Sequence, residues 1–407
     1  MDEFLKTNGN SNVWDNHNHE NSRNVLNSFQ RYRYPLSIIF IDTKKFQGTA
    51  QDFGNILHKG IASGYFLRLQ ILDLGDARVY TTGLPNNIGE LIHLMNLNLR
   101  GTLIKEIPPS FFNLPNLHTL DLMHTSIRIF HIPTKKLQKL KHLYLDSRTK
   151  FVTQLSDNSL KNLQTLKTKL EKGYRDDDSP LIDGLDKLIN LRELKLKLDI
   201  EPSQQKKVTD HVVKLKHLHS LKLTTAKANA MHHGVLWLEP LSGLENLTLL
   251  NLHGVISDSR VIINTNGLPQ TLTHLKLTMC DLSDDPMPVL EKLHNLRWLF
   301  LSSGSYTGSS MVCSKGGFPQ LLYLKFSELE LKEWNIEEQA MQRLMEIEVK
   351  QCWSLEVPTG LKNVKSLCQL KFKNMPPAFM ALIEKTKEQN WEIINFQGPV
   401  IMEFGSP

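Results

Sequence analysis

Residues 94–122 read LMNLNLRGTLIKEIPPSFFNLPNLHTLDL, and the spacing of their leucines determines the architecture. The pattern L-x-x-L-x-L begins at Leu94 and begins again at Leu117, 23 residues later. Its L-x-L part is typical of a short strand, because successive side chains of a strand point to opposite faces. The leucines are therefore expected to face a core, and the residues between them to face solvent.

The same pattern recurs along almost the whole chain, at steps of 23 to 29 residues. Its copies begin at Leu69, Leu94, Leu117, Leu140, Leu163, Leu191, Leu218, Leu247, Leu272, Leu296, Leu321, Leu344 and Leu367, with degenerate copies at Leu36 and Trp391. This period is typical of leucine-rich repeats. A single repeat cannot bury its apolar side, so about 14–15 stacked repeats share one core. The sequence predicts an α/β solenoid: a leucine-rich-repeat horseshoe with a parallel concave β-sheet and a convex side of irregular, 3₁₀ and short-helical segments.

The sequence divides into a leader and a repeat domain. Residues 1–33 are polar and rich in Asn, which predicts a poorly ordered leader. The repeat domain is expected to span residues 34–407, with a degenerate repeat and its long irregular connection over 34–66, regular repeats over 67–376, and a terminal helix and last strand over 377–400. That helix would cover the last strand, because the ends of a solenoid need caps.

Two features of the repeats give local predictions. The position three residues after the last strand leucine is expected to be buried and to bond to loop backbone. Small side chains stand there at Thr102, Thr125, Cys280 and Cys352. Residues 303–317 are rich in Gly and Ser, which predicts a mobile loop.

Composition and charge place the chain among ordinary soluble proteins. Hydrophobic residues make up 40% and charged residues 22%, and the formal net charge of +6 by itself says little about nucleic acid. The four cysteines form no CxxC pair, which favours a reducing compartment. The N-terminus has no secretory signal, and no run of 18 apolar residues could span a membrane. We therefore expect a cytoplasmic protein without a membrane span.

The sequence offers no catalytic constellation. It contains no H-E-x-x-H, G-x-S-x-G or G-x-G-x-x-G motif, so we expect neither an enzyme nor a bound cofactor. The His17/His19 pair has no third ligand at a sensible spacing, and His232/His233 is the other candidate. Solvated histidines are favoured over metal ligands for both pairs, so we expect no metal site.

The residues between the strand leucines form the predicted concave face, and lysines dominate its later part. The candidate partner-binding lysines are Lys167, Lys195, Lys197, Lys222, Lys276, Lys325 and Lys371. Trp298, Phe300 and Tyr323 form an aromatic group among them. One interpretation is an ordinary polar surface, with Trp298 and Phe300 partly buried under residues 303–317. The other is a binding site for an acidic partner, because like charges on adjacent strands repel and give the fold no benefit.

Residues 67–122 carry a phrase that is more specific than the general repeat. They read LRLQILDLGDARVYTTGLPNNIGELIHLMNLNLRGTLIKEIPPSFFNLPNLHTLDL. This stretch resembles the repeat region of plant intracellular nucleotide-binding leucine-rich-repeat (NLR) disease-resistance proteins, of the class with an N-terminal coiled coil. YPLSIIFID at 34–42 is similar to the strand that opens their repeat domain, and 363–396 is similar to its closing repeats and helix. The resemblance covers roughly residues 30–400.

The resemblance implies a non-catalytic protein-recognition module of plant innate immunity, which senses a pathogen effector or a guarded host protein. The sequence contains no G-x-x-x-x-G-K-[ST], so ATP binding is not implied, and we expect a truncated or separated repeat domain of a resistance protein. The expected partner is a protein with an acidic surface: an effector, a host protein or a nucleotide-binding switch domain. A repeat adaptor or ubiquitin-ligase substrate receptor is an alternative, and RNA binding along the lysines is a weaker one.

Overall fold

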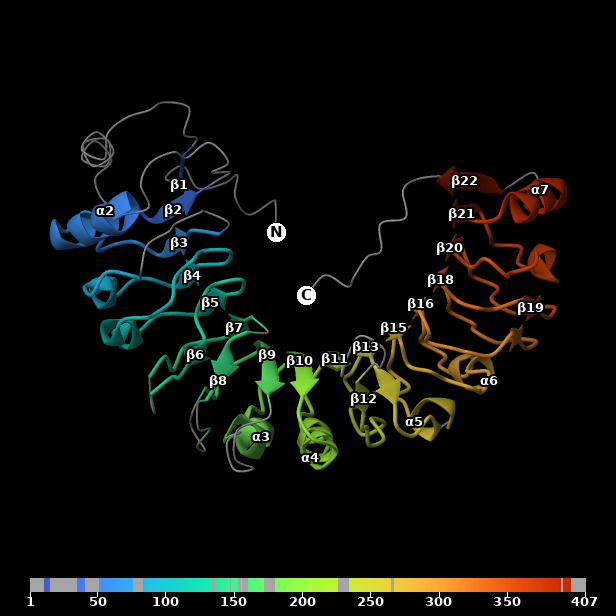
Figure 1. Cartoon of the computed structure of the whole chain (residues 1–407), viewed down its shortest axis with the longest axis horizontal. Helices are drawn as coiled ribbons and strands as arrows, with labels where there is room; N and C mark the ends of the chain where they lie inside the picture. The colour runs from blue at the N-terminus through green and yellow to red at the C-terminus, as the bar shows by residue number, and fades with distance from the viewer. Residues whose placement is uncertain are drawn as a thin grey trace. The chain divides into compact units, whose positions relative to one another are not determined.

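The chain forms two compact units, residues 1–191 and residues 192–407. The computed structural model describes residues 11–14, 35–40, 51–75, 83–133, 136–146, 148–152, 155, 160–171, 180–225, 234–264, 267–388 and 391–396. Each unit is a solenoid, with parallel strands on one side and helices or short turns on the other (Figure 1).

The first unit contains strands β1 to β9. These are β1 (Ser11–Trp14), β2 (Ser37–Phe40), β3 (Ile71–Asp73), β4 (Asn96–Asn98), β5 (Thr119–Leu122), β6 (Ile129–Phe130), β7 (His142–Leu145), β8 (Lys150–Phe151) and β9 (Thr165–Glu171). Its helical segments are α2 (Gln51–Ala62), α3 (Pro180–Gly184) and the 3₁₀ turns η1 (Ile88–Glu90), η2 (Pro109–Asn113) and η3 (Leu185–Lys187). Strand β1 lies within the predicted leader and pairs in parallel with β2.

The second unit contains parallel strands of the same kind. Its strands are β10 (Glu193–Asp199), β11 (Ser220–Thr225), β13 (Leu249–His253), β15 (His274–Thr278), β16 (Trp298–Ser302), β18 (Tyr323–Ser327), β20 (Glu346–Lys350), β21 (Gln369–Lys373) and β22 (Glu392–Phe396). On the outer side lie α4 (Pro202–Val212), α5 (Arg260–Ile263), α6 (Met287–Leu290), η4 (Leu361–Asn363) and α7 (Pro377–Thr386). Two short parallel pairs complete it: β12 (Val235–Leu236) with β14 (Val255–Ile256), and β17 (Ser310–Cys313) with β19 (Glu333–Ile336).

The register of the strands brings the template leucines into the core. Leu194 of β10 lies opposite Leu221 of β11, and the same alignment continues from strand to strand through the second unit. These two leucines are 0% and 1% exposed. Burying each such side chain contributes on the order of 1.5–3 kcal/mol, which is offset in part by the cost of ordering the chain. The predicted fold class, a leucine-rich-repeat solenoid built on a parallel sheet, is confirmed.

The small side chains that follow the strands are buried and hydrogen-bonded, as predicted. Thr102 Oγ1 donates to the backbone oxygen of Leu99 at 2.6 Å, and Thr125 makes the equivalent bond at 2.9 Å. The thiols of Cys280 and Cys352 lie 3.5 Å from backbone oxygens two residues earlier. Burial raises the pKa of the Cys280 thiol to about 12, so this cysteine is an inert core residue at neutral pH.

An asparagine ladder, which the leucine pattern alone does not predict, links neighbouring repeats. The asparagine directly before the first leucine of a repeat donates to a backbone oxygen of the preceding repeat, at 2.8–2.9 Å. The residues of this ladder are Asn116, Asn162, Asn190, Asn246 and Asn295. These bonds satisfy backbone carbonyls that the stacking of repeats leaves without strand partners.

The two degenerate end copies are shifted by one residue from the predicted register. The pattern puts Ile39 and Ile394 in the buried position of their strands. Instead Ile38 lies opposite Leu72, and Ile393 takes the equivalent place in β22. Ile39 and Ile394 therefore stand in the outward position. Each strand holds two isoleucines in succession, so its own alternation is ambiguous and the neighbouring strand sets the register.

The prediction of a mobile loop over residues 303–317 is wrong for its central part. Residues 310–313 form strand β17, which pairs in parallel with β19 and packs against α6. Met311 and Cys313 alternate with exposed or half-buried neighbours and are themselves fully buried. Because the residues around them are mostly Gly and Ser, the composition of the segment does not reveal this alternation. The limits of the leader and of the repeat domain, at 33 and 407, fall outside the described residues and stay predictions.

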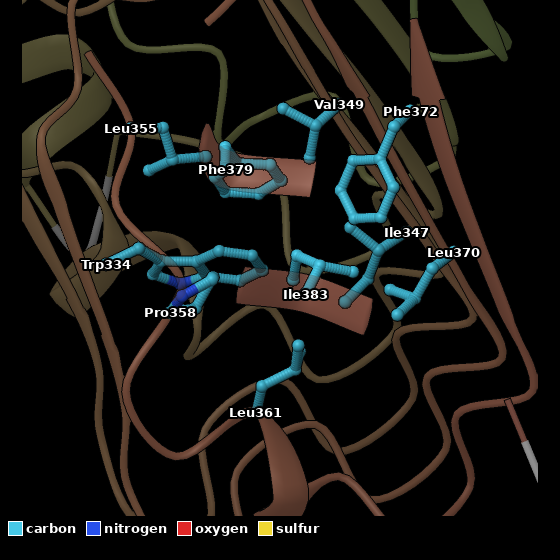
Figure 2. Close-up of a pocket in the computed structure, with 10 residues that line it drawn as sticks. All are labelled: Trp334, Ile347, Val349, Leu355, Pro358, Leu361, Leu370, Phe372, Phe379 and Ile383. Carbon is cyan, nitrogen blue, oxygen red and sulfur yellow. The ribbon is translucent and has the colours of Figure 1, made fainter. Parts of the chain in front are cut away.

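Helix α7 covers the last strands of the second unit, within the segment predicted to hold a terminal helix. Phe379 and Ile383 point from this helix toward Leu370 and Phe372 across a small apolar cavity (Figure 2). The rings of Phe372 and Phe379 meet edge to face, with centroids 5.3 Å apart. The cavity carries no polar lining, so we assign it to imperfect packing under the cap and not to a ligand site.

Candidate partner-binding surface

The outward residues of the second unit's strands stand in three parallel columns, here named the sheet face. The first column contains Glu193, Ser220, Leu249, His274, Trp298, Tyr323, Glu346, Gln369 and Glu392. The second contains Lys195, Lys222, Asn251, Lys276, Phe300, Lys325, Glu348, Lys371 and Ile394. The third begins at Lys197 and ends at Phe396. The structure thus brings nine of the ten predicted site residues onto one face.

Three of these lysines are paired with glutamates of the same face. The pairs are Lys195–Glu193 at 2.6 Å, Lys325–Glu348 at 2.8 Å and Lys371–Glu346 at 2.6 Å, measured from Nζ to Oε1. All of these side chains are partly exposed, so each pair contributes at most about 1 kcal/mol to stability. Their larger effect is to balance three positive charges that the sequence alone suggests are open to a partner.

Lys222 and Lys276 are different, because neither forms an ion pair with a described residue. Lys222 is half-buried on β11, and Lys276 is exposed on β15, with Asn251 of β13 between them. Burial lowers the pKa of Lys222, and the positive charges of Lys276 and Lys195 lower it further. Lys222 and Lys276 are therefore the lysines of the second column that no described carboxylate balances; Lys197 and Lys373 of the third column also form no ion pair with a described residue.

Four aromatic rings lie beside the two unpaired lysines. The rings of His274 and Trp298 stack with centroids 5.6 Å apart, and Tyr323 lies 4.7 Å from Trp298. Phe300 meets Tyr323 edge to face at 5.4 Å. All four side chains are half-buried, and Leu249 continues the apolar surface with 40% of its area exposed. We name these five residues the ring platform.

His274 is absent from the predicted site residues, although the structure places it in the platform. It occupies the position of Trp298 one repeat earlier, so its place in the column is readable from the leucine spacing. Burial lowers the pKa of His274, and the charge of Arg297 lowers it further. The imidazole is therefore neutral at pH 7 and acts as one more flat, mostly apolar ring.

Tyr323 is fixed to the paired part of the sheet face. Its hydroxyl donates to Glu348, which also accepts from Lys325. Burial raises the pKa of Tyr323 and the Glu348 carboxylate raises it further, so the phenol stays protonated. Burial opposes ionisation of Glu348, but hydrogen bonds from Lys325 and Tyr323 outweigh it and hold the pKa of this carboxyl below its usual value. Hydrogen bonding thus fixes the ring of Tyr323 at one edge of the platform.

Lys167 is separate from this group, because it belongs to the first unit. It lies on β9 opposite Tyr144 of β7. The earlier strands of that unit present amides and carboxyls in place of lysines. Asn98 Nδ2 donates to Asp73 Oδ1 at 2.8 Å, and burial raises the pKa of Asp121. Lys167 therefore lies on the last strand of the first unit, after strands that present amides and carboxyls.

Two expected absences concern the described part of the chain only. No helix there is both long enough and apolar enough to cross a bilayer. No group of three or more His, Cys, Asp or Glu side chains in the same residues is placed to hold a metal ion. His17, His19, His232 and His233 lie outside the described residues.

Comparisons with known proteins agree with the repeat fold. A family model described as a leucine-rich repeat region matches residues 55–388. Two similar proteins come from Arabidopsis thaliana. The probable disease resistance RPP8-like protein 4 is 33% identical over 313 residues, and the probable disease resistance protein RXW24L is 33% identical over 331. The alignments cover 75% and 80% of this chain but 33% and 35% of those proteins, so the chain spans about a third of their length.

A solved structure agrees with the fold. A leucine-rich-repeat protein of Leptospira interrogans superposes with a TM-score of 0.54 at 20% identity, covering 84% of this chain and 80% of that one. Likeness at this identity supports the architecture alone. The chain therefore belongs to the leucine-rich-repeat family, and its repeats are of the type found in plant disease-resistance proteins.

Proposed function

We propose that this chain is a non-catalytic protein-recognition module of plant defence, and that the sheet face of its second unit binds an acidic protein surface. The similarity to disease-resistance proteins over three quarters of the chain carries the first part. The second part rests on Lys222 and Lys276, whose charges no described carboxylate balances. The partner would be a pathogen effector, a guarded host protein or a nucleotide-binding switch domain.

The defence role has a direct test in the plant. A line in which the gene is disrupted is expected to lose resistance to at least one pathogen isolate that the intact line resists. Restoring the intact gene should restore resistance, and restoring a Lys222→Glu/Lys276→Glu variant should not. Unchanged resistance of the disrupted line across a broad isolate panel would contradict the defence role.

The acidic-partner part is tested with poly-L-glutamate as a probe, by fluorescence anisotropy at increasing salt. Reversing both unpaired lysines, Lys222→Glu with Lys276→Glu, is expected to weaken binding at least tenfold and to flatten its salt dependence. Lys195 is left unchanged, since reversing it would put two carboxylates beside each other and confound binding with stability.

The matched control makes the same change of net charge at positions outside the sheet face. Lys292 and Lys315 are exposed side chains of the second unit outside the three columns, and Lys292→Glu with Lys315→Glu should leave binding unchanged. Equal losses in both variants would mean that only net charge matters, and the proposed surface would be wrong. Binding of homopolymeric RNA through Lys222 and Lys276, without binding of polyglutamate, would assign the face to nucleic acid instead.

A further inference from the structure

The lysines of the sheet face are not equivalent as ligand-binding groups. A ligand carboxylate that approaches Lys195, Lys325 or Lys371 meets a glutamate already 2.6–2.8 Å from the ammonium nitrogen. Binding there would need to break an existing ion pair, so the net gain is small. Lys222 and Lys276 have no such competitor among the described residues. Within the second column, carboxylates of a partner therefore gain most at these two positions.

The two lysines and the ring platform lie in a fixed order along the sheet. Lys222, Asn251, Lys276 and Phe300 occupy the same column on successive strands β11, β13, β15 and β16. With about 4.8 Å between strands, Lys276 is roughly 10 Å from Lys222 at the backbone, and Phe300 is about 5 Å further on. Trp298 stands beside Phe300 on the same strand, two residues earlier.

The apolar part of this arrangement stays partly open to solvent. Leu249 is 40% exposed, and the four rings are half-buried although they already contact one another. His274 is neutral at pH 7, because burial and Arg297 lower its pKa, so no positive charge interrupts the platform. A large apolar side chain laid on these rings would bury area that the fold leaves exposed, and aromatic anchors of this kind dominate binding energy at interfaces.

We infer that the sheet face, if it binds a protein as proposed above, accepts an extended segment in the polyproline-II conformation, with two acidic residues three positions apart and a large apolar residue three positions after the second. This conformation has three residues per turn and advances about 3.1 Å per residue, so positions n, n+3 and n+6 face the same side. Acidic residues at n and n+3 are then about 9 Å apart and reach Lys222 and Lys276. An apolar side chain at n+6 lies about 19 Å from n, above β18, and reaches the rings of Tyr323 and Trp298. The ion-paired lysines hold the border of the platform and are not ligand contacts.

The probe is a fluorescein-labelled peptide, GDSGDSGFG, together with a peptide of the reversed sequence, because the segment could run in either direction. One of the two is expected to bind the intact protein at least tenfold more tightly than two altered peptides. In the first the phenylalanine is replaced by serine, and in the second both aspartates are replaced by asparagine. These comparisons change the ligand only, so they do not depend on whether a protein variant folds.

Two protein variants locate the binding on the sheet face. Lys222→Gln with Lys276→Gln should weaken binding of the tighter peptide at least tenfold. The control removes a whole ion pair from the same face, Glu346→Gln with Lys371→Met, which leaves the net charge unchanged and should leave peptide affinity within twofold. Thermal unfolding of each variant shows whether it is folded. A loss as large in the control as in the lysine variant would overturn the inference.

The outcomes separate this inference from the proposed function. If the serine peptide binds as tightly as the phenylalanine peptide and needs Lys222 and Lys276, the face recognises acid and the apolar anchor is wrong. If no peptide binds but polyglutamate still binds through the same lysines, the proposed acidic partner stands and the three-point segment is overturned. If the asparagine peptide binds best, the platform is a purely apolar site. Lys222 and Lys276 then do not recognise acidic groups, and both proposals are contradicted.

Discussion

Gly360 directly precedes the 3₁₀ turn η4 and has a φ of +76°, a left-handed conformation that side-chain-bearing residues rarely adopt. A Cβ placed there would also lie 1.9 Å from the backbone oxygen of Ile336. Gly360→Ala is therefore expected to destabilise the protein by roughly 2–4 kcal/mol, from the left-handed backbone and the forced shift of a packed strand together. Urea denaturation followed by circular dichroism measures the change.

Gly316 provides the matched comparison for Gly360. It has the same φ of +76°, but a Cβ built on it meets no atom within 4 Å. Gly316→Ala should therefore cost only the backbone term, about 1 kcal/mol. The difference between the two variants isolates the contact with Ile336. Equal losses would show that the strand end relaxes freely and that the close approach is not a constraint.

The pairing of single charges is the feature of the sheet face that the sequence does not predict. The leucine spacing alone predicts that Lys325 and Lys371 face outward, and the register confirms it. Whether each lysine is open or balanced depends on Glu348 and Glu346, which lie on β20 between them. Such cross-strand neighbours are about 4.8 Å apart in space but more than twenty residues apart in sequence. The rotamers that join them are set by packing, which a one-dimensional pattern does not contain.

Among the elements, the regular repeats could be predicted and the irregular ones could not. Every clean copy of the leucine pattern from Leu69 to Leu367 forms a strand of the sheet, because buried alternate leucines leave one register with an apolar core. Helix α2, in contrast, lies where the sequence predicts only an irregular connection. Its buried side chains Ile56, Leu57 and Ile61 lie at helical spacing, but Gly60 interrupts the pattern.

Gly60 explains why α2 is hard to recognise from the sequence. Glycine in a helix interior usually argues against a helix, because it costs about 1 kcal/mol relative to alanine. Here a Cβ at position 60 would lie 2.1 Å from the ring of Phe66, which is 1% exposed. The glycine is therefore needed for the ring to pack against the helix. A contact six residues further along the chain thus outweighs the local helix propensity, and only the folded structure reveals it.

The second unit as a whole gains its stability from contacts between neighbouring repeats, so damage at one end should stay near that end. Ile383 is 0% exposed on the inner side of α7, against the last strands. Ile383→Ala is expected to cost about 2–5 kcal/mol by leaving a cavity under the cap. Hydrogen exchange followed by mass spectrometry should then accelerate in β21 and β22, less in β18, and not in β10 and β11.

Leu382, the adjacent residue of α7, is the matched control for this experiment. It is 51% exposed, so Leu382→Ala removes a side chain of the same size from the same helix with little change in burial. Its exchange pattern should remain that of the intact protein, within about 0.5 kcal/mol of local stability. If Ile383→Ala instead accelerates exchange equally from β10 to β22, the second unit unfolds as one cooperative block. The sheet face would then be coupled to the cap, and a partner bound at Lys222 and Lys276 would slow exchange in α7 as well.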